Sequence, residues 1–300
     1  MTISLSRRRA LALLGMMGAA AALPLQARAA ALAGVRFGYT AMTWGQDDRQ
    51  AIEDIAALGF AGIQFRNNVV QEFKPDDLRA LLQQKGLAFA AMSSGTVDID
   101  ADPAAELARH LDNARYLKAC GGQYLQLLDK LGPYGRPVDK AGCEKLGRLL
   151  TEIGKAVAGI GITACYHNHL DTLSEKPEGL ELVLAASDPR YVKFELDTAH
   201  ALAGGADPAK LVERYHDRLA LLHLKDVVDL PADTKGKYPF QFVELGRGRV
   251  DFASVIAALE RVGFKGWAVI ELDRVPDKGR TPRESAAISK AFLQARGVQI

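Results

Sequence analysis

From Val35 onward, short apolar runs rich in β-branched and aromatic residues alternate with longer segments of helical periodicity. A strand repeats its apolar positions every two residues, whereas an amphipathic helix repeats them every three to four. On this basis the sequence predicts eight strands, at Val35–Thr40, Gly62–Arg66, Leu87–Met92, Gln123–Leu128, Ile162–His167, Val192–Asp197, Ala220–Lys225 and Ala268–Asp273. It predicts helices over 48–58, 75–85, 103–119, 139–158, 178–186, 208–216, 252–262 and 282–295. This alternation is typical of a parallel sheet.

Several of these helices carry a start signal. Asp102 and Asp207 each precede a proline, which places a capping carboxylate before a first-turn Pro. Thr281 and Glu284 have the spacing of a capping box, and Asp251 is expected to cap the helix that follows it. The helix boundaries are therefore predicted independently of the apolar pattern.

The pattern inside the later strands favours a closed barrel over an open sheet. Glu195 and Asp197 share one face of the sixth strand and the apolar residues share the other, and His223 and Lys225 share one face of the seventh. An open parallel sheet covered on both faces would give nearly continuous apolar runs. Eight strand–helix units in about 270 residues fit a single (β/α)8 barrel, a TIM barrel of the α/β class, whose usual size is about 250 residues. A doubly wound open sheet is the alternative.

The first 29 residues have the pattern of an export signal. Arg7–Arg9 precede an Ala-rich apolar stretch over 10–25, and Ala27–Ala29 form a small-x-small cleavage motif. The arginine pair resembles a twin-arginine signal. A membrane-spanning helix needs about 20 apolar residues, so an uncleaved anchor is the weaker alternative. We therefore predict a signal peptide over 1–29, a barrel over 30–300 with no stable membrane anchor, and a periplasmic location.

Composition and charge narrow the class of partner. The chain has 38 Lys+Arg and 36 Asp+Glu, a net charge of +2, but residues 1–29 contain four arginines and no acid. The remaining chain is net −2, which argues against a nucleic-acid partner. Cys120, Cys143 and Cys165 are scattered, so neither a disulfide framework nor a cysteine metal site is expected. A homo-oligomer is compatible with the sequence.

Histidines and carboxylates gather where the later strands end. In a (β/α)8 barrel the active site is built from the loops at the carboxyl ends of the strands. His and carboxylate groups converging from several strands suit a divalent cation, Mn²⁺ or Zn²⁺ above all, with Mg²⁺ and Co²⁺ as further options. The alternative is a polar rim of capping and salt-bridging groups. The residues concerned are His167, His169, Asp197, His200, His223, Asp226 and Glu271.

Five motifs resemble the xylose-isomerase-like TIM-barrel superfamily, in particular its sugar phosphate isomerase/epimerase branch. They are 166–169 (Tyr-His-Asn-His), 195–200 (Glu-Leu-Asp-Thr-Ala-His), 222–226 (Leu-His-Leu-Lys-Asp), 245–252 (Leu-Gly-Arg-Gly-Arg-Val-Asp-Phe) and 269–271 (Val-Ile-Glu). The resemblance implies one metal ion held at the ends of strands five to eight. The implied ligands are His167, Asp197, His223 and Glu271. His167 and His169 share a face, so either can be the strand-five ligand, and His167 is our choice.

The resemblance also implies a reaction. Epimerases and dehydratases of the family often have Glu at the strand-five position, where this chain has a His-containing stretch. A two-base epimerase therefore lacks one of its carboxylates here. The proton carriers that remain are Glu271, His200, His169 and Lys225. Among rim residues, Trp44 offers an aromatic face for a sugar and Arg66 offers donors for hydroxyls, with simple packing at the rim as the alternative for each. We assign Trp44, Arg66, Gln126 and Arg247 to the substrate.

The leading hypothesis is an exported, metal-dependent isomerase or epimerase that acts on a sugar or keto-sugar through an enediolate. The alternatives are a 3-keto-glycoside lyase or hydratase, which shares the enolate step, and a non-catalytic sugar-binding protein. The AP endonuclease branch is disfavoured, since the ends of strands two and three lack its additional histidines. The long aperiodic stretch 226–249 carries Lys235, Lys237, Tyr238 and Phe240 and is predicted to be a lid.

Overall fold

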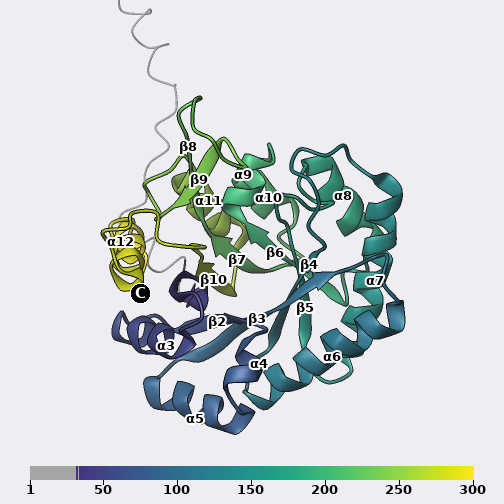
Figure 1. The fold of residues 1–300 in the computed structure, drawn as a ribbon, viewed down its shortest axis with the longest axis horizontal. Helices are drawn as coiled ribbons and strands as arrows, with labels where there is room; N and C mark the ends of the chain where they lie inside the picture. Colours follow the sequence, from purple (N-terminus) through teal and green to yellow (C-terminus); the bar gives the residue numbers. More distant parts are fainter. Residues whose placement is uncertain (1–31, 33) are drawn as a thin grey trace, which may run out of the picture.

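The computed structural model describes Leu32 and residues 34–300. The predicted signal peptide, residues 1–29, lies outside the described residues. Eight parallel strands close into a barrel in the order β1-β10-β7-β6-β5-β4-β3-β2, which confirms the predicted (β/α)8 fold (Figure 1). The strands are β1 (Arg36–Thr40), β2 (Gly62–Arg66), β3 (Ala88–Val97), β4 (Tyr124–Asp129), β5 (Thr163–His167), β6 (Val192–Asp197), β7 (Leu219–Leu224) and β10 (Trp267–Ile270).

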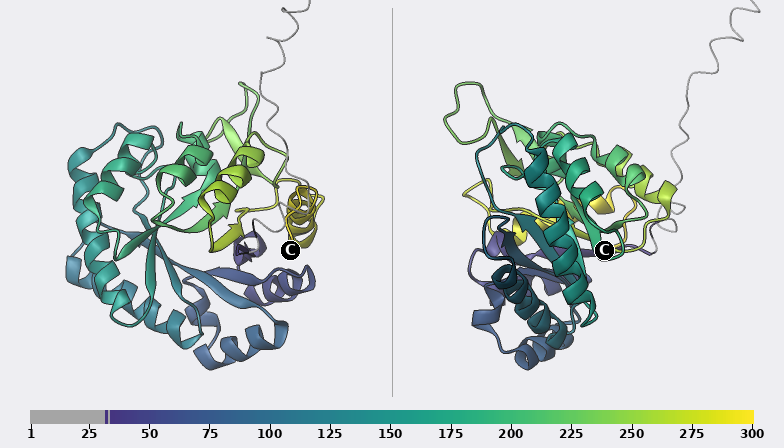
Figure 2. Two further views of the ribbon diagram at one scale, coloured as in Figure 1. Left: turned by 180° about the vertical axis from the view of Figure 1, so that it is seen from behind. Right: turned by 90° about the vertical axis from the view of Figure 1, so that its right-hand side faces the viewer.

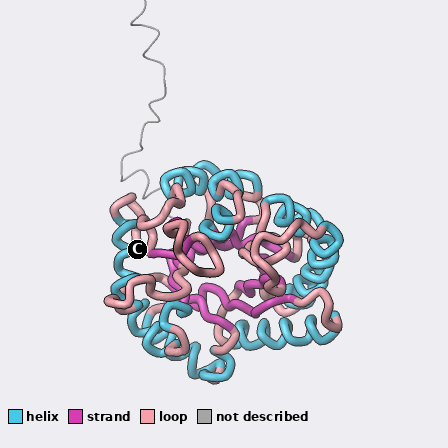
Figure 3. Tube along the Cα trace, turned by 45° about the horizontal axis from the view of Figure 1, so that its top comes forward, coloured by secondary structure: helices cyan, strands magenta, loops and turns pink. Residues whose placement is uncertain are grey.

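Helices surround the ring of strands, as the tube in Figure 3 shows. Asp102, Asp207 and Asp251 accept backbone N–H groups at the starts of their helices, and Thr281 with Glu284 forms the predicted capping box. No helix in the described part of the chain is both long and apolar enough to cross a membrane. The main helices are α3 (Asp48–Ala57), α5 (Pro75–Lys85), α6 (Pro103–Ala119), α7 (Lys140–Ala158), α8 (Pro177–Ala186), α10 (Pro208–Arg214), α11 (Phe252–Val262) and α12 (Pro282–Gln294).

Additional short elements lie at the carboxyl ends of the strands. They are η1 (Ala41–Trp44), α4 (Val69–Glu72), α9 (Thr198–Ala203) and the antiparallel hairpin β8 (Asp226–Asp229) and β9 (Phe240–Val243). The hairpin lies within the stretch 226–249, for which the sequence predicts an aperiodic lid, and its tip projects from the molecule in the right view of Figure 2. The sequence did not predict it because its strands are only four residues long.

One carboxylate holds the base of this hairpin. Asp226 accepts the backbone N–H groups of Val227, Gly246, Gly248 and Val250 at 2.9–3.0 Å. A Cβ at Gly248 would lie 2.3 Å from the Asp226 carboxylate, so the turn can pass it only as glycine. Asp226 is therefore a structural residue that fixes where the hairpin leaves the barrel.

Apolar side chains close the lower part of the barrel interior. Cys165, Leu221, Trp267 and Val269 are buried there together with small residues of β3. Trp267 fits because the residue of β2 that faces it is Gly62. A Cβ at this position would lie 2.5 Å from the indole ring. Cys165 is thus a core residue, as its apolar surroundings in the sequence indicate. Polar residues of the same inward-facing rows lie above this layer, at the carboxyl ends of the strands.

Candidate metal centre and active site

Alternation along the strands brings the predicted ligands to one place. Residues i, i+2 and i+4 of a strand face the same side, so His167 ends the inward row of β5 and Asp197 that of β6. His223 lies opposite Asp197 in the register of β6 and β7. Glu271 follows β10 directly, and its N–H donates to the carbonyl of Leu224 at 3.1 Å.

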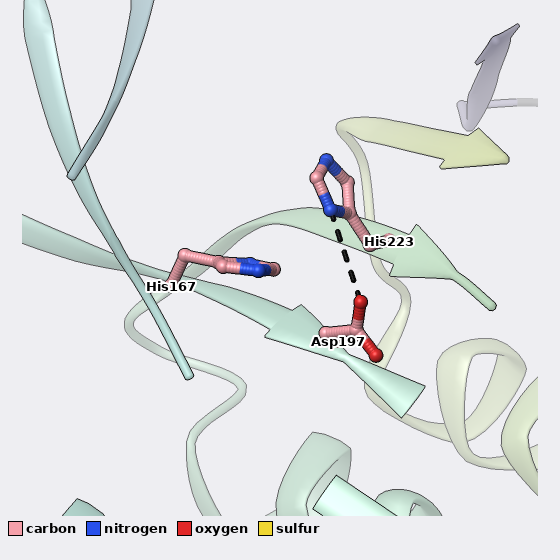
Figure 4. A group of neighbouring side chains, drawn as sticks. All are labelled: His167, Asp197 and His223. Atoms are coloured by element: carbon pink, nitrogen blue, oxygen red, sulfur yellow. Dashed lines mark ion pairs between the residues drawn. The ribbon is translucent and has the colours of Figure 1, made fainter. Parts of the chain in front are cut away.

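Two overlapping groups of these side chains have the geometry of a metal site. One ligand atom each from His167, Asp197 and His223 lie within 4.8 Å of one another (Figure 4). The same holds for Asp197, His200 and Glu271. The four ligands implied by the sequence are thus neighbours, and all are buried.

Buried atoms without hydrogen-bond partners show that a cation fits this site. His167 Nδ1, Asp197 Oδ2 and His223 Nδ1 are inaccessible to solvent and have no partner with hydrogen-bond geometry, although ion-pair contacts join His223 Nδ1 to Asp197 Oδ2 and to Glu271. Leaving such groups unpaired costs free energy, and buried polar groups are nearly always bonded. Imidazole nitrogen and carboxylate oxygen are donors that Zn²⁺ and Mn²⁺ accept. The donor set therefore matches a divalent metal ion.

Two side chains on the inner side of the barrel fix the orientation of the His223 ring. Its Nε2 lies 2.8 Å from Glu195 Oε1 and 3.0 Å from Gln64 Oε1. Its Nδ1 is thereby turned toward Glu271 Oε2 at 3.2 Å and Asp197 Oδ2 at 3.9 Å. A carboxylate behind a ligating histidine fixes the tautomer and the ring orientation. The alternation in β6 predicts that Glu195 faces the barrel interior. No function was assigned to Glu195 from the sequence, although an inward-facing carboxylate beside Asp197 was the signal that it has one.

The cluster has an excess of negative charge. Four carboxylates, those of Glu195, Asp197, Glu271 and Asp273, surround the single ammonium group of Lys225 and the ring of His223. Burial raises the pKa of Asp197 to about 7. Burial alone would lower the pKa of His223, but the charges of Glu271 and Glu195 outweigh it and raise that pKa well above its ordinary value. Such surroundings stabilise a positive charge at the centre.

Lys225 is a buried cation with several partners. Its Nζ donates to Asp273 Oδ1 at 2.6 Å and to Glu271 Oε1 at 2.9 Å, and lies 3.2 Å from His200 Nε2. It also lies 4.2 Å from the ring centroid of Phe242. Burial would lower the pKa of Lys225, but the carboxylates of Asp273 and Glu271 raise it above its ordinary value. Lys225 therefore stays an ammonium group.

The rings of His169 and His200 lie against each other, with centroids 3.7 Å apart and planes at 36°. Burial lowers the pKa of both, helped by the charge of Lys225, so both rings are neutral at neutral pH. His169 Nδ1 lies 2.6 Å from the carbonyl oxygen of Leu170, to which it can only donate, so the lone pair is assigned to Nε2. His169 is half-buried, whereas His200 is fully buried and accepts the Leu170 N–H at 3.3 Å.

The residues assigned to the substrate are divided by the structure. Arg66 and Gln126 line a small cavity on the β1–β4 side, together with Gln64, Ser93 and Glu271. Trp44 does not reach it: its ring packs on Tyr39 in the core and its Nε1 donates to Asp54. The turn of η1 buries the indole. The sequence alone could not indicate this, because no periodic pattern fixes the direction of a side chain outside a strand or a long helix.

Arg247 also lies away from the cluster. Its half-exposed guanidinium is 3.9 Å from the carboxylate of Glu244. Glu244 in turn accepts from Arg280 and Ser285, which belong to the segment that leads into α12. Arg247 is thus held beside Glu244 and is not among the residues that line the cavity at Arg66 and Gln126.

The fold and the site define a class of protein. A family model described as the xylose isomerase-like TIM barrel matches residues 52–295, so the chain belongs to this family, as its motifs predicted. It is 28% identical over 290 residues to an inosose dehydratase of Geobacillus kaustophilus, covering 86% of this chain and 93% of that protein.

Solved structures of similar fold include enzymes that act on sugars. The zinc-bound IolI protein matches with a TM-score of 0.71 at 18% identity, covering 87% of this chain and 98% of IolI. D-allulose 3-epimerase of a Methylomonas species, in complex with D-allulose, matches with a TM-score of 0.67 at 22% identity, covering 87% and 97%. Relatives by sequence thus include a dehydratase, and proteins of the same fold include an epimerase.

Proposed function

We propose that this protein is a divalent-metal-dependent enzyme that removes a proton next to the carbonyl of a keto-sugar. The observation that carries the proposal is the set of buried, unpartnered donor atoms on His167, Asp197 and His223. The zinc ion in the IolI structure supports it. Epimerisation next to a carbonyl and dehydration of a keto-polyol both begin with this proton removal, so both kinds of relative fit the same first step.

His167, Asp197, His223 and Glu271 would hold the metal ion. When bound, a divalent cation polarises the substrate's carbonyl and stabilises the enediolate charge. His169 is the proton acceptor, because its ring is neutral, half-exposed and assigned a free lone pair at Nε2.

Lys225 has a different task from His169. Since it stays protonated, it adds positive charge beside the enediolate and can donate a proton to an oxygen that leaves the substrate. His200 Nδ1 accepts the Leu170 N–H, so its Nε2 carries the ring proton; at 3.2 Å from Lys225 Nζ it can return a proton to Lys225 once the ammonium group has donated one. The three residues together supply one base and one acid on the same side of the barrel.

The position of these groups favours elimination as the outcome. Of the residues that line the cavity on the β1–β4 side, Thr40, Gln64, Arg66, Ser93 and Gln126 do not accept a proton at neutral pH. An epimerase needs an acceptor on each face of the carbon, whereas an elimination needs a base and an acid for the leaving group. The inosose dehydratases among the relatives agree with this reaction class.

In this elimination the proton next to the carbonyl goes to His169 and its electron pair forms a C=C bond. The C–O bond at the adjoining carbon breaks, and Lys225 protonates the departing oxygen. The product is an unsaturated keto-sugar together with water or an alcohol. An isomerase or epimerase is the second candidate, in which Glu271, between the two sides of the mouth, serves as the other base.

We also propose that the enzyme acts outside the cytoplasm. The arginine-led apolar segment and its cleavage motif in residues 1–29 support this location. Unphosphorylated sugars are the substrates that suit such a compartment.

The test is proton exchange in D₂O, followed by NMR with Mn²⁺-loaded protein and two substrates, a keto-inositol and a methyl 3-keto-glucoside. We expect metal-dependent loss of the proton next to the carbonyl, with release of the leaving group at the same rate. Deuterium in a recovered epimer without release would make the enzyme an epimerase. Absence of exchange in both substrates would contradict the proposed function.

A further inference from the structure

A second cavity adjoins the proposed active site. It has a volume of about 330 Å³ and lies between the β8–β9 hairpin and the segment that follows β10. Tyr238, Phe240 and Phe242 line one side, and Val275 and Pro276 line the other. Five of the nine lining residues are therefore aromatic or apolar, and the other four are Gln241, Asp273, Arg274 and Lys278.

Two of its lining residues also belong to the active site. Phe242 lies 4.2 Å from Lys225 Nζ and 5.0 Å from the ring of His200, centroid to centroid. Asp273 lines the cavity and accepts from Lys225 at 2.6 Å. A molecule that reacts at the metal centre therefore has this cavity directly next to the acid that would protonate its leaving group.

The aromatic wall is already assembled. Tyr238 and Phe240 stack with centroids 5.1 Å apart and planes at 10°, and Phe242 follows at 6.0 Å. Tyr134 packs edge-on against Tyr238 and Phe240 from behind. Because these rings are held in place before a ligand arrives, binding on them costs little ordering of the protein.

Asp171 fastens this wall to the barrel. Its carboxylate accepts from the Tyr238 hydroxyl and from Lys237 Nζ. Asp171 is itself buried and has φ of 65°, a left-handed conformation uncommon for a residue other than glycine. The loop after β5 and the tip of the hairpin are thereby tied together above the site.

We propose that this cavity binds an aromatic or other apolar ring joined to the keto-sugar through the oxygen that leaves. The inference rests on the proposed function and names its substrate class as keto-glycosides with a ring-bearing aglycone. Aromatic side chains offer ring faces for stacking, and 330 Å³ lies at the lower end of the volume of small-molecule pockets, roughly 300–1,000 Å³. The sugar occupies the polar centre, and the glycosidic oxygen lies between the two, beside Lys225.

The experiment compares phenyl β-D-glucoside with methyl β-D-glucoside by calorimetric titration of the Mn²⁺-loaded protein. Neither probe has the carbonyl, so neither can react. We expect the phenyl glucoside to bind at least about 10-fold more tightly, since the ring adds buried apolar area. Phe240→Leu, which removes the ring face, should reduce this preference about 5-fold and leave the affinity for the methyl glucoside unchanged.

Two further variants keep the test decisive if Phe240→Leu is unstable. Val275→Trp fills the cavity and should abolish the preference for the phenyl glucoside. Leu131→Ala truncates an exposed apolar side chain that does not line the cavity and should change neither affinity. Equal affinities in the wild-type protein, or a preference untouched by Val275→Trp, would overturn the inference.

The two proposals can fail separately. If the protein exchanges the proton of keto-sugars but does not prefer the phenyl glucoside, the aglycone cavity is contradicted and the proposed reaction is supported. If the protein prefers the phenyl glucoside but exchanges no proton, the ring-binding cavity is supported and the proposed reaction is contradicted.

Discussion

The two sides of the barrel mouth are built from the same strand–helix units but differ in charge. The side formed by β5, β6, β7 and β10 holds the four carboxylates, Lys225 and the histidines of the candidate centre. The small cavity on the side formed by β1–β4 is lined by two amides, two hydroxyls and the guanidinium of Arg66, with Glu271 at its border. The charged side can hold a cation and move protons, whereas the amides, hydroxyls and guanidinium of the other side offer hydrogen bonds to hydroxyl groups. The comparison assigns chemistry to the first side and recognition to the second.

The contrast extends to how buried polar groups are treated. On the β1–β4 side, His110 behind β3 bonds Ser94 Oγ at 2.6 Å and is kept neutral by its surroundings. On the other side, Asp197 Oδ2 and His223 Nδ1 are buried without partners. Tyr39 Oη and Thr40 Oγ1 of β1 also lack hydrogen-bond partners, but the unpartnered atoms of the charged side belong to residues whose ligand atoms lie within 4.8 Å of one another, as a metal site requires.

The largest effect is expected from Asp197→Asn. The amide keeps the bond in which Oδ1 accepts the His200 N–H but loses the charge that faces the metal, so metal affinity should fall at least about 100-fold and metal-dependent turnover should vanish. Calorimetric titration with Mn²⁺ measures the affinity. Asp217→Asn, at an exposed carboxylate, is the control and should behave like the wild-type protein.

The same variant should have the opposite effect on the metal-free protein. Burial raises the folded-state pKa of Asp197 from its ordinary value near 3.8 to about 7. The folded chain then binds the proton more tightly than the unfolded chain, so stability is lost as the pH rises from about 4 through 7. At pH 8 metal-free Asp197→Asn should therefore have a Tm at least equal to that of the wild-type protein; a lower Tm would contradict an uncompensated buried charge.

The next largest effect concerns the proposed base. His169→Gln should slow proton exchange about 10²- to 10⁴-fold, the usual contribution of a general base, while Mn²⁺ affinity stays unchanged. NMR in D₂O gives the rate and calorimetry the affinity. His216→Gln replaces an exposed histidine outside the site and is the matched control. A full exchange rate in His169→Gln would assign the base to another residue.

A smaller effect is expected on the neutral side. Gln126→Ala should raise KM for a keto-sugar about 5- to 10-fold, the cost of roughly one hydrogen bond, with kcat and metal affinity nearly unchanged. Steady-state kinetics separates the two parameters. A large fall in kcat would show that the β1–β4 side takes part in the chemistry and would break the division of labour.

The smallest effect concerns stability alone. Burial, and then the charge of Arg109, lowers the pKa of His110 to about 4, below its ordinary 6.5. The unfolded chain then takes up the proton first, so stability present above pH 6.5 should fall as the pH drops toward 4, by at most about 1.4 kcal/mol per pH unit. Urea unfolding at pH 7.5 and 5.0 measures this slope. His110→Gln should flatten it, and an unchanged slope would exclude His110 as its source.

The sequence predicted the fold and the charged side well because both depend on a period of two. Alternation in β6 and β7 puts Asp197, His223 and Lys225 on the inner face, and the strands supply the convergence. The histidine at the end of β5 is likewise placed by its position in the strand. Local patterns are sufficient wherever a regular element fixes the direction of a side chain.

Prediction is harder where irregular segments decide. Trp44 and Arg247 lie in non-strand segments where no period of two applies, and their side chains bind Asp54 and Glu244 respectively. The partners of Lys225 were missed in part because Asp273 lies beyond the end of β10, where no period applies. Phe242 reaches Lys225 only through a hairpin whose base is fixed by Asp226. Such contacts depend on the whole fold rather than on spacing.

The central claim is that the charged side of the mouth holds one divalent metal ion. Calorimetric titration of Mn²⁺ or Zn²⁺ into the metal-free protein tests it most directly, with His223→Ala and Gln126→Ala alongside. The account predicts one ion per chain for the wild-type protein and for Gln126→Ala, and loss of that binding in His223→Ala. Absence of binding in the wild-type protein, or equal binding in His223→Ala, would contradict it.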